Sequence, residues 1–515
     1  MLDALRAEWT KFWTIRGWAI GLTLAAALLV LFAYLTANGQ HSGVCVPGPG
    51  AAGAQQPQCG SGHPYVPVGP DGEAVADSYY LAGRQLRGNG TISARVISLA
   101  GVTAAGPANA APSLTRTRPG LAAWSKAGVI IAASSRQGAP YAAVMATARH
   151  GVRFQHDYTH DTAGLTGAVS AASPRWVRLT RYGDVLTAYD SVTGRTWRTI
   201  GSTTLHGLPR VVDAGLFVTS PVTYGGLATM ATARFDNVAL LGATLGRGWH
   251  GQGIGQSPHD FYDVLGHGGY HRAGVAFVLS GSGDIAAALT AGGDTPASIL
   301  TQALIAALIV IVIVAAMFIT SEYRRGLIRT TLAAVPRRGD MLTSKALVIA
   351  GATFTAGAAA GAISIALGDH IAATGGNYIL PMSAPADLRI AVGTGAILAL
   401  SAVAILAIGA LLRRTAATVV AGIVVLVLPA MLTVPYISGT RPGSDPALPL
   451  WLLRLSPAAG FSILGSLPRS AQVSYPYTIA NGYAPLAPGA GLAVLAAWTL
   501  VLLLLAQRRL ARSDA

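Results

Sequence analysis

The stretch 322–345, EYRRGLIRTTLAAVPRRGDMLTSK, is strongly basic and lies between two long apolar runs, 299–319 and 346–367. Arginine and lysine accumulate on the inner side of short connections between membrane helices. The stretch therefore predicts a cytoplasmic loop that joins two membrane-spanning helices.

The pattern also predicts a short helix within the loop. Its apolar residues recur at i, i+1, i+4 and i+5, which gives one apolar stripe between arginines, and Pro336 ends the helix. The stripe consists of Leu327, Ile328, Thr331 and Leu332. A basic helix held under the membrane is suited to receiving movement from a partner protein.

Composition places the chain among membrane proteins. Of its 515 residues, 52% are hydrophobic and only 11% are charged, and the mean hydropathy is +0.49. The formal charge of +15 raises the possibility of a nucleic-acid partner. A basic groove interleaved with stacking aromatics is missing, which excludes that class.

Six apolar runs approach the length of about 20 residues that crosses a bilayer. They are 18–37, 299–319, 346–367, 390–412, 416–437 and 490–506. The four clusters of arginine and lysine lie in alternate connections, so one face of the membrane receives all of them. We therefore expect a multi-pass protein of the plasma membrane with both termini in the cytoplasm.

The predicted fold class is an α-helical membrane protein with six transmembrane helices and an all-β sandwich, jelly-roll-like, inserted between helices 1 and 2. The expected parts are 1–37, an amphipathic interface helix with the first transmembrane helix; 38–76, a linker; 77–290, an extracellular sandwich; and 298–515, helices 2 to 6. The run 18–37 is longer than the core of a signal peptide, and no small-x-small cleavage site follows it, so we expect an uncleaved anchor.

Both cysteines of the chain, Cys45 and Cys59, follow the first helix. Two thiols close together in an oxidising exterior predict one disulfide. A metal site with His41 and His63 is the alternative, and two free thiols are a third possibility.

The external segment is typical of a β-sandwich. It contains short runs rich in β-branched and aromatic residues, separated by turn signals such as Tyr182-Gly183-Asp184. The expected strands are 91–99, 127–133, 142–148, 151–156, 175–182, 185–189, 196–201, 211–219 and 231–240.

The series GNGTISARVISL, WSKAGVIIAAS, GVRFQHDY, PRWVRLTRYGDVLTAYDSVTGRTWRTIGS, AGLFVTS and ATARFDNVAL, within 77–242, resembles the concanavalin A-like lectin/glucanase sandwich. The segment VAFVLSGSGDI, 275–285, looks like the strand that normally begins such a module, although here it follows the last strand. We expect a permuted sandwich in which 273–280 pairs with 78–86, so that the chain enters and leaves at neighbouring points.

Catalysis by the sandwich is not expected. Glycosidases of this fold need two nearby carboxylates, and Glu73 is the only glutamate of the external segment. Trp124, Trp176, Tyr189 and Trp197 form a possible ligand platform, although aromatics on strands mostly fill a core. His and Asp residues at 156–161 form either a cation site or a solvated turn, and we favour the turn.

The N-terminal sequence MLDALRAEWTKFWTIRGW predicts an amphipathic helix on the inner membrane surface. Leu5, Trp9, Phe12 and Trp13 share one side, and the basic residues, Lys11 among them, point away from it. Together with EYRRGLIRTTLAAVPRRGDMLTSKALV and LWLLRLSPAAGFSIL, this region resembles the permeases of type-2 ABC exporters, over 1–40 and 298–510.

The resemblance implies that the loop 322–345 couples the permease to an ATPase. The resemblance assigns this coupling role to Glu322, Arg324, Arg325, Gly326, Arg329, Thr330, Pro336 and Arg337. The simpler interpretation is that these arginines only enforce topology or hold anionic lipid.

The chain has no G-x-x-x-x-G-K-[ST] phosphate loop. We therefore expect no cofactor in this chain, with ATP and magnesium bound by a separate ABC ATPase subunit, and no enzymatic activity of its own. A second permease copy or homologue, membrane lipids and an extracellular glycan are the other expected partners. An apolar lining suits an amphipathic, lipid-like or glycan-linked substrate.

Three smaller features are expected in the helical part. Gly357 and Gly361 form a small-xxx-small site for helix packing. Pro429 and Pro435 kink the fifth run. The loop 438–489 contains short helices that dip into the outer leaflet, either as a gate or as interfacial packing. The competing function is a membrane-anchored surface receptor or adhesion protein that binds glycans through the sandwich.

Overall fold

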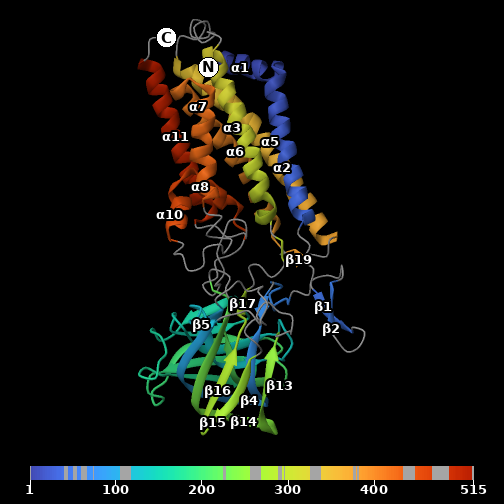
Figure 1. Ribbon diagram of the computed structural model, residues 1–515, viewed down its shortest axis with the longest axis vertical. Coiled ribbons are helices and arrows are strands. Elements are labelled where there is room, and N and C mark those ends of the chain that lie inside the picture. The colour runs from blue at the N-terminus through green and yellow to red at the C-terminus, as the bar shows by residue number, and fades with distance from the viewer. Residues whose placement is uncertain are drawn as a thin grey trace.

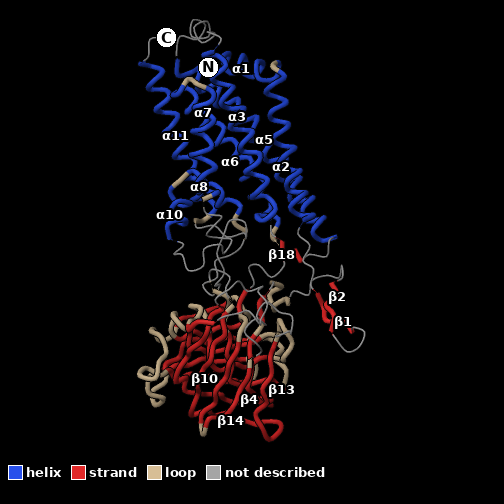
Figure 2. The backbone as a smooth tube through the Cα atoms, viewed as in Figure 1, coloured by secondary structure: helices blue, strands red, loops and turns tan. Residues whose placement is uncertain are grey.

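A bundle of helices and a β-sandwich occupy opposite ends of the computed structural model, and both chain termini lie at the bundle end away from the sandwich (Figure 1). Figure 2 shows the same division by secondary structure. The structure describes residues 2–39, 45–49, 55–59, 67–73, 75–104, 117–223, 228–255, 268–287, 293–294, 296–324, 338–374, 378–379, 382–432, 447–466 and 486–512.

Five described helices are long and apolar enough to cross a membrane. They are α2 (Arg16–Gly39), α3 (Pro296–Arg324), α5 (Arg338–Thr374), α6 (Ala384–Leu412) and α11 (Pro488–Arg512). Each contains one of the predicted apolar runs. A shorter helix, α1 (Leu2–Thr14), precedes α2.

The predicted run 416–437 forms a shorter apolar helix, Thr415–Met431. It consists of α7 (Thr415–Gly422), a π-helical turn η4 (Ile423–Val427) and α8 (Leu428–Met431). Pro429 has no N–H to donate to the preceding turn, which accounts for the widened turn before it. This irregular turn lies where a kink at Pro429 was predicted, and Pro435 lies outside the described residues.

Close packing of α5 on α6 depends on glycine. A Cβ at Gly395 would lie 2.5 Å from the carbonyl oxygen of Phe354, and one at Gly357 would lie 2.8 Å from Leu398. A Cβ at Gly361 would lie 3.2 Å from Thr394. The backbones therefore approach as closely as the small-xxx-small pattern predicted.

The loop 438–489 contributes two short helices, α10 (Ala447–Leu455) and η5 (Pro457–Leu464). All residues of η5 are buried, and Arg389 of α6 donates to the carbonyl oxygens of Ile463 and Gly465 at 3.2 and 2.7 Å. The predicted short helices are thus present, with η5 inserted against α6 and α11.

The sandwich consists of strands that follow α2 and precede α3 in the chain. Its main path runs β12-β11-β10-β4-β13-β6-β7-β8-β9, while β14 pairs with β4 and β16, β15 pairs with β16, and β5 pairs with β4. The strands are β4 (Tyr79–Ala104), β5 (Thr117–Pro119), β6 (Lys126–Ala132), β7 (Tyr141–Thr147), β8 (Val152–His156), β9 (His160–Ala163), β10 (Arg175–Tyr182), β11 (Val185–Ser191), β12 (Arg198–Thr204), β13 (Val211–Thr219), β14 (Thr229–Ile254), β15 (Gly269–Ala273) and β16 (Ala276–Gly281).

All nine predicted strands are present. Two of them are much longer than predicted, because β4 and β14 each continue for 26 residues through irregular register. Gly242, with φ of 131°, lies at one of these shifts in register. Such shifts interrupt the alternation of inward and outward side chains, which is the pattern that predicts strand length from sequence.

The predicted pairing of 273–280 with 78–86 is wrong. Strand β16 pairs with β14 and β15, because β13 and β14 already occupy both edges of this part of β4. The expected proximity of entry and exit is nevertheless present, since β17 (Ile285–Ala287) pairs antiparallel with β3 (Val75–Asp77).

A buried polar network holds this entry–exit pair together. The ammonium of Lys126, which is fully buried, lies 2.8 Å from the Asp284 carboxylate and 2.5 Å from the Ile285 carbonyl oxygen. The Asp77 carboxylate accepts from the Tyr158 hydroxyl at 2.7 Å and from the backbone N–H of Gly138 at 2.9 Å. The buried charge of Lys126 is tolerated because Asp284 carries the opposite charge beside it.

We expect the entry–exit pair to weaken as pH rises. Burial raises the pKa of Asp77 to about 6, although the bonds from Tyr158 and Gly138 act in the opposite direction. A carboxyl whose pKa is raised on folding favours the folded state below its unfolded pKa, and this contribution is lost as pH rises through 6. The loss amounts to up to about 3 kcal/mol.

Hydrogen-exchange protection of the β3 and β17 amides in the full-length chain, measured from pH 4 to 8, tests this expectation. Asp77→Asn should remove most of the dependence, whereas Asp71→Asn, at an exposed turn, should leave it intact. An equally steep dependence in Asp77→Asn would show that another group is responsible.

Candidate functional site

The residues predicted to couple the chain to a partner lie at or beyond the end of α3. Glu322 lies in its last turn and is 1% exposed, and Arg324 is its last residue. The other predicted coupling residues lie outside the described residues: Arg325, Gly326, Arg329, Thr330, Pro336 and Arg337.

Glu322 belongs to a cluster of four charged side chains from three helices, which we call the charge cluster: Glu8 and Lys11 of α1, Glu322 of α3 and Lys345 of α5. The Lys345 ammonium lies 2.6 Å from Glu8 Oε2 and 2.8 Å from Glu322 Oε1. Lys11 donates to Glu322 and lies 3.8 Å from Glu8.

The charge cluster is electrically balanced, and three of its four side chains are buried, while that of Lys11 is 32% exposed. The side chain of Lys345 is 0% exposed, that of Glu322 is 2% and that of Glu8 is 8%. Isolated charges in such a place cost many kcal/mol, so each depends on the opposite charges beside it. Two carboxylates and two ammonium groups neutralise one another. Removing either Lys345 or Glu322 would leave a buried charge without its partner.

Lys11 remains protonated in this arrangement. Its burial lowers its pKa, but the hydrogen bond and negative charge of Glu322, with a smaller effect of Glu8, outweigh burial and raise the pKa above the usual lysine value. The ion pair between α1 and α3 therefore persists at neutral and moderately alkaline pH.

Aromatic packing surrounds the charge cluster. Phe12 of α1 and Trp18 of α2 both meet the ring of Phe318 edge to face, at centroid separations of 5.7 and 5.6 Å. The Lys345 ammonium lies 4.8 Å from the centroid of the same ring, a cation–π contact that strengthens in a dry environment. These rings shield the charge cluster and fix α1 across the ends of α3 and α5.

This geometry corrects the predicted position of Lys11 on α1. The rings of Trp9 and Phe12 both pack against the ring of Trp13, at centroid separations of 5.8 and 5.6 Å, in keeping with a shared side, and the acidic Glu8 is buried. Lys11, predicted to point away, reaches inward because the Glu322 carboxylate offers it a partner with few competitors.

Glu8 and the pairing role of Lys345 were not predicted from the sequence. A compositional signal was available, because the chain contains only three glutamates and three lysines among far more aspartates and arginines. Two of each meet in the charge cluster. The third lysine, Lys126, forms the buried pair with Asp284 in the sandwich.

The predicted ligand platform separates into two places. Trp176 lies on β10, with its ring 6.4 Å from that of Trp197, and Tyr189 of neighbouring β11 is half-buried. The guanidinium of Arg178 covers the Trp197 ring at 3.7 Å, and that of Arg95 lies 5.6 Å from the Trp176 ring. Trp124 lies elsewhere: it is 7% exposed and stacks on His150 at 4.0 Å.

The His and Asp residues at 156–161 form a turn, as favoured. Asp157 and Tyr158 have positive φ values of 44° and 61°, and the Asp161 carboxylate is bound by Arg153. The described residues contain no group of three or more His, Cys, Asp or Glu side chains that could hold a metal ion.

The two cysteines lie on a separate hairpin. Strand β1 (Cys45–Pro49) pairs antiparallel with β2 (Gln55–Cys59), and Cys45 is directly opposite Cys59. Opposed residues have Cα atoms about 4.5–5.5 Å apart, within the range that a disulfide bridges. The side chains, and His41 and His63, lie outside the described residues, so the disulfide stays a prediction.

Comparison with known proteins identifies no family. No family profile matches the chain and no curated protein resembles it in sequence. Two solved structures of scytalido-glutamic peptidase with transition-state analogues are similar at 10% identity and a TM-score of 0.24, covering 40% of this chain and 98% of the peptidase. A Saccharomyces cerevisiae protein of unknown function is similar at 14% identity and a TM-score of 0.19, covering 32% of this chain and 74% of its own. Similarities of this size carry no functional argument.

We expect Lys345→Met to lower the free energy of unfolding by about 3–5 kcal/mol, because it leaves Glu8 and Glu322 buried without their shared cation. Glu8→Gln should cost less than that, and the double variant should show a coupling energy of about 1–3 kcal/mol. SDS titration of the full-length chain in mixed micelles measures these values.

Arg16→Gln is the matched control, since Arg16 is an exposed basic residue just beyond α1. It should change stability little. Additive effects of Glu8→Gln and Lys345→Met, with no coupling energy, would contradict a direct ion pair between α1 and α5.

Proposed function

We propose that this chain is the membrane-spanning permease subunit of an ATP-driven exporter of the type-2 ABC class, moving an amphipathic, lipid-like or glycan-linked substrate out of the cell. The observation that carries the proposal is the charge cluster. Glu322 and Lys345 bind one another at the two ends of the basic loop, and both bind α1.

This geometry gives the loop a mechanical connection to the membrane helices. A push on the loop reaches α3 through Glu322 and α5 through Lys345, and it reaches α1 through the carboxylate of Glu8. Packed helices and buried ion pairs shift between discrete arrangements instead of deforming gradually. A partner that moves the loop therefore moves three helices together.

The proposal includes six transmembrane helices, with Thr415–Met431 as the start of the fifth. It places the termini and the loop 322–345 in the cytoplasm and the sandwich outside the cell. In support, both termini lie at the end of the bundle opposite the sandwich (Figure 1), and basic residues border the helices at that end, such as Arg414, Arg508 and Arg509.

The energy source is a separate subunit in this proposal. The sequence has no phosphate-binding loop, so ATP and magnesium bind an ABC ATPase that docks on the basic loop. Two permease chains and two ATPase subunits complete the exporter.

The glycan-receptor alternative is less well supported. Sugar rings bind by stacking on open aromatic faces, but Arg178 and Arg95 already lie over the rings of Trp197 and Trp176. A receptor also needs one anchoring helix, whereas the charge cluster ties three helices to a loop.

We expect the double variant Arg329→Glu, Arg337→Glu to lose partner-stimulated ATP hydrolysis, because reversed charges repel a partner that the basic loop attracts; each reversal at a docking surface costs several kcal/mol. Co-purification of the ATPase and its hydrolysis rate in proteoliposomes measure the loss. Arg512→Glu, at the exposed C-terminal end of α11, is the control and should behave as wild type. Unchanged stimulation in the double variant would favour a loop that only sets topology.

A second expectation concerns sidedness. In a Cys45→Ser, Cys59→Ser background, a membrane-impermeant maleimide should label Arg149→Cys in intact cells and Thr330→Cys only in inverted vesicles. Arg149 is exposed on the sandwich. Labelling of both positions from the same side would refute the proposed topology and, with it, the transport function.

A further inference from the structure

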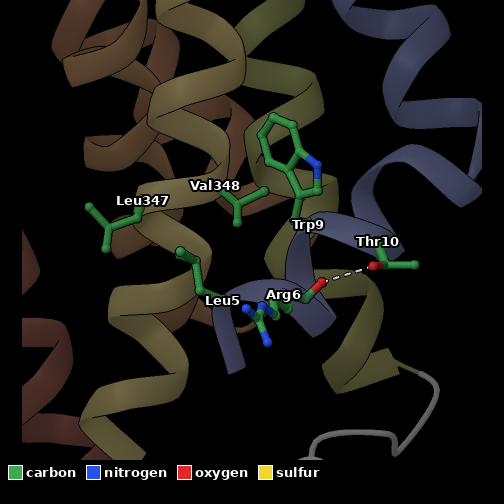
Figure 3. A pocket seen from close by; sticks show the side chains of 6 residues that line it. All are labelled: Leu5, Arg6, Trp9, Thr10, Leu347 and Val348. Atoms are coloured by element: carbon green, nitrogen blue, oxygen red, sulfur yellow. Dashed lines mark hydrogen bonds between the residues drawn. The ribbon is translucent and has the colours of Figure 1, made fainter. Parts of the chain in front are cut away.

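A groove of about 550 Å³ lies between α1 and α5 beside the charge cluster. Figure 3 shows its lining: Leu5, Arg6, Trp9 and Thr10 from α1, and Leu347 and Val348 from α5. Apart from Arg6 and the Thr10 hydroxyl, which donates to the Arg6 carbonyl oxygen at 2.9 Å, the walls are apolar. Such walls bind hydrocarbon in preference to water.

The single charge of the groove is positive. Arg6 is exposed, and within the described part of the chain it takes part in no ion pair, unlike Lys11 on the same helix. Trp9 lines the same groove and is 48% exposed, and its ring packs against that of Trp13, which is equally exposed. Exposed indoles and arginines together are typical of the level where lipid headgroups lie.

An exposed apolar face of α5 extends beyond the groove. Leu347 is 51% exposed and Phe354 is 36% exposed, and Gly351 lies between them on the same helical side. A Cβ added at Gly351 would meet no atom within 4 Å. An open apolar path about 10 Å long therefore leads from Arg6 toward the middle of the helix.

We propose that this groove is a binding site for one molecule of an anionic diacyl phospholipid. Its phosphate pairs with Arg6, and one acyl chain lies between α1 and α5 and then along Leu347, Gly351 and Phe354. The positive rim selects the anionic headgroup, and the apolar path selects a chain. A soluble acidic ligand would leave the path without a partner.

The location gives the lipid a structural role. Glu8 lies between the groove residues Arg6 and Trp9 in sequence, and Lys345 precedes Leu347, so the lipid would contact the same two helices that the Lys345–Glu8 ion pair joins. The inference requires a chain that sits in a membrane, and it is independent of any ATPase partner.

Native mass spectrometry tests the site. Full-length chain reconstituted in nanodiscs of equal phosphatidylglycerol and phosphatidylcholine is released into mild detergent, and retained lipids are counted per chain. Wild type should retain one phosphatidylglycerol with a preference of about fivefold over phosphatidylcholine, the effect expected of one arginine near a membrane surface.

Arg6→Gln should reduce this preference to about one, because the groove then has no charge to pair with the phosphate. Gly351→Phe fills open space and should abolish retention of either lipid. The matched controls are Arg16→Gln, and Gly17→Phe, where an added Cβ also meets no atom within 4 Å; both should retain lipid as wild type does.

Three results would overturn the proposal: a preference that survives Arg6→Gln, an equal loss in Arg16→Gln, or full retention in Gly351→Phe. Retention is measured without ATP or partner, so failure here leaves the proposed transport function to its own tests. Loss of ATPase stimulation with normal lipid retention would likewise leave this site intact.

Discussion

The buried ammonium of Lys345, held between the carboxylates of Glu8 and Glu322, is the interaction on which the organisation of the helix bundle depends. It brings together helices that begin at residues 2, 296 and 338 of the chain. Hydrophobic packing within a bilayer is weakly directional, because lipid is as apolar as the helices. A buried charge is different: it has few acceptable positions, and so it fixes the register of α1, α3 and α5 relative to one another.

Most secondary structure could be predicted from the sequence because it depends on local patterns. The apolar runs determine α2, α3, α5, α6 and α11, and alternating β-branched residues determine strands such as β10 and β13. Within the described residues, the predicted run 416–437 is helical from Thr415 to Met431, with a π-helical turn just before Pro429.

The charge cluster could not be predicted in the same way. It joins Glu8 to Lys345 across 337 positions of sequence, and no periodicity links residues so far apart. The predicted position of Lys11 was wrong for the same reason: periodicity assigned Lys11 to a polar side, but a carboxylate from another helix determined where it lies. The same limit applies to β16, whose neighbours were decided by which edges of the sheet were already occupied.

The short pair formed by β3 and β17 has a consequence for the history of the chain. The sandwich begins and finishes within one cross-strand ladder, with Asp77 opposite Ile285. A segment whose ends meet can be acquired or deleted in a single genetic event without rerouting the membrane helices on either side. The sandwich therefore occupies a place where its removal would leave the helices on either side joined by a plain hairpin.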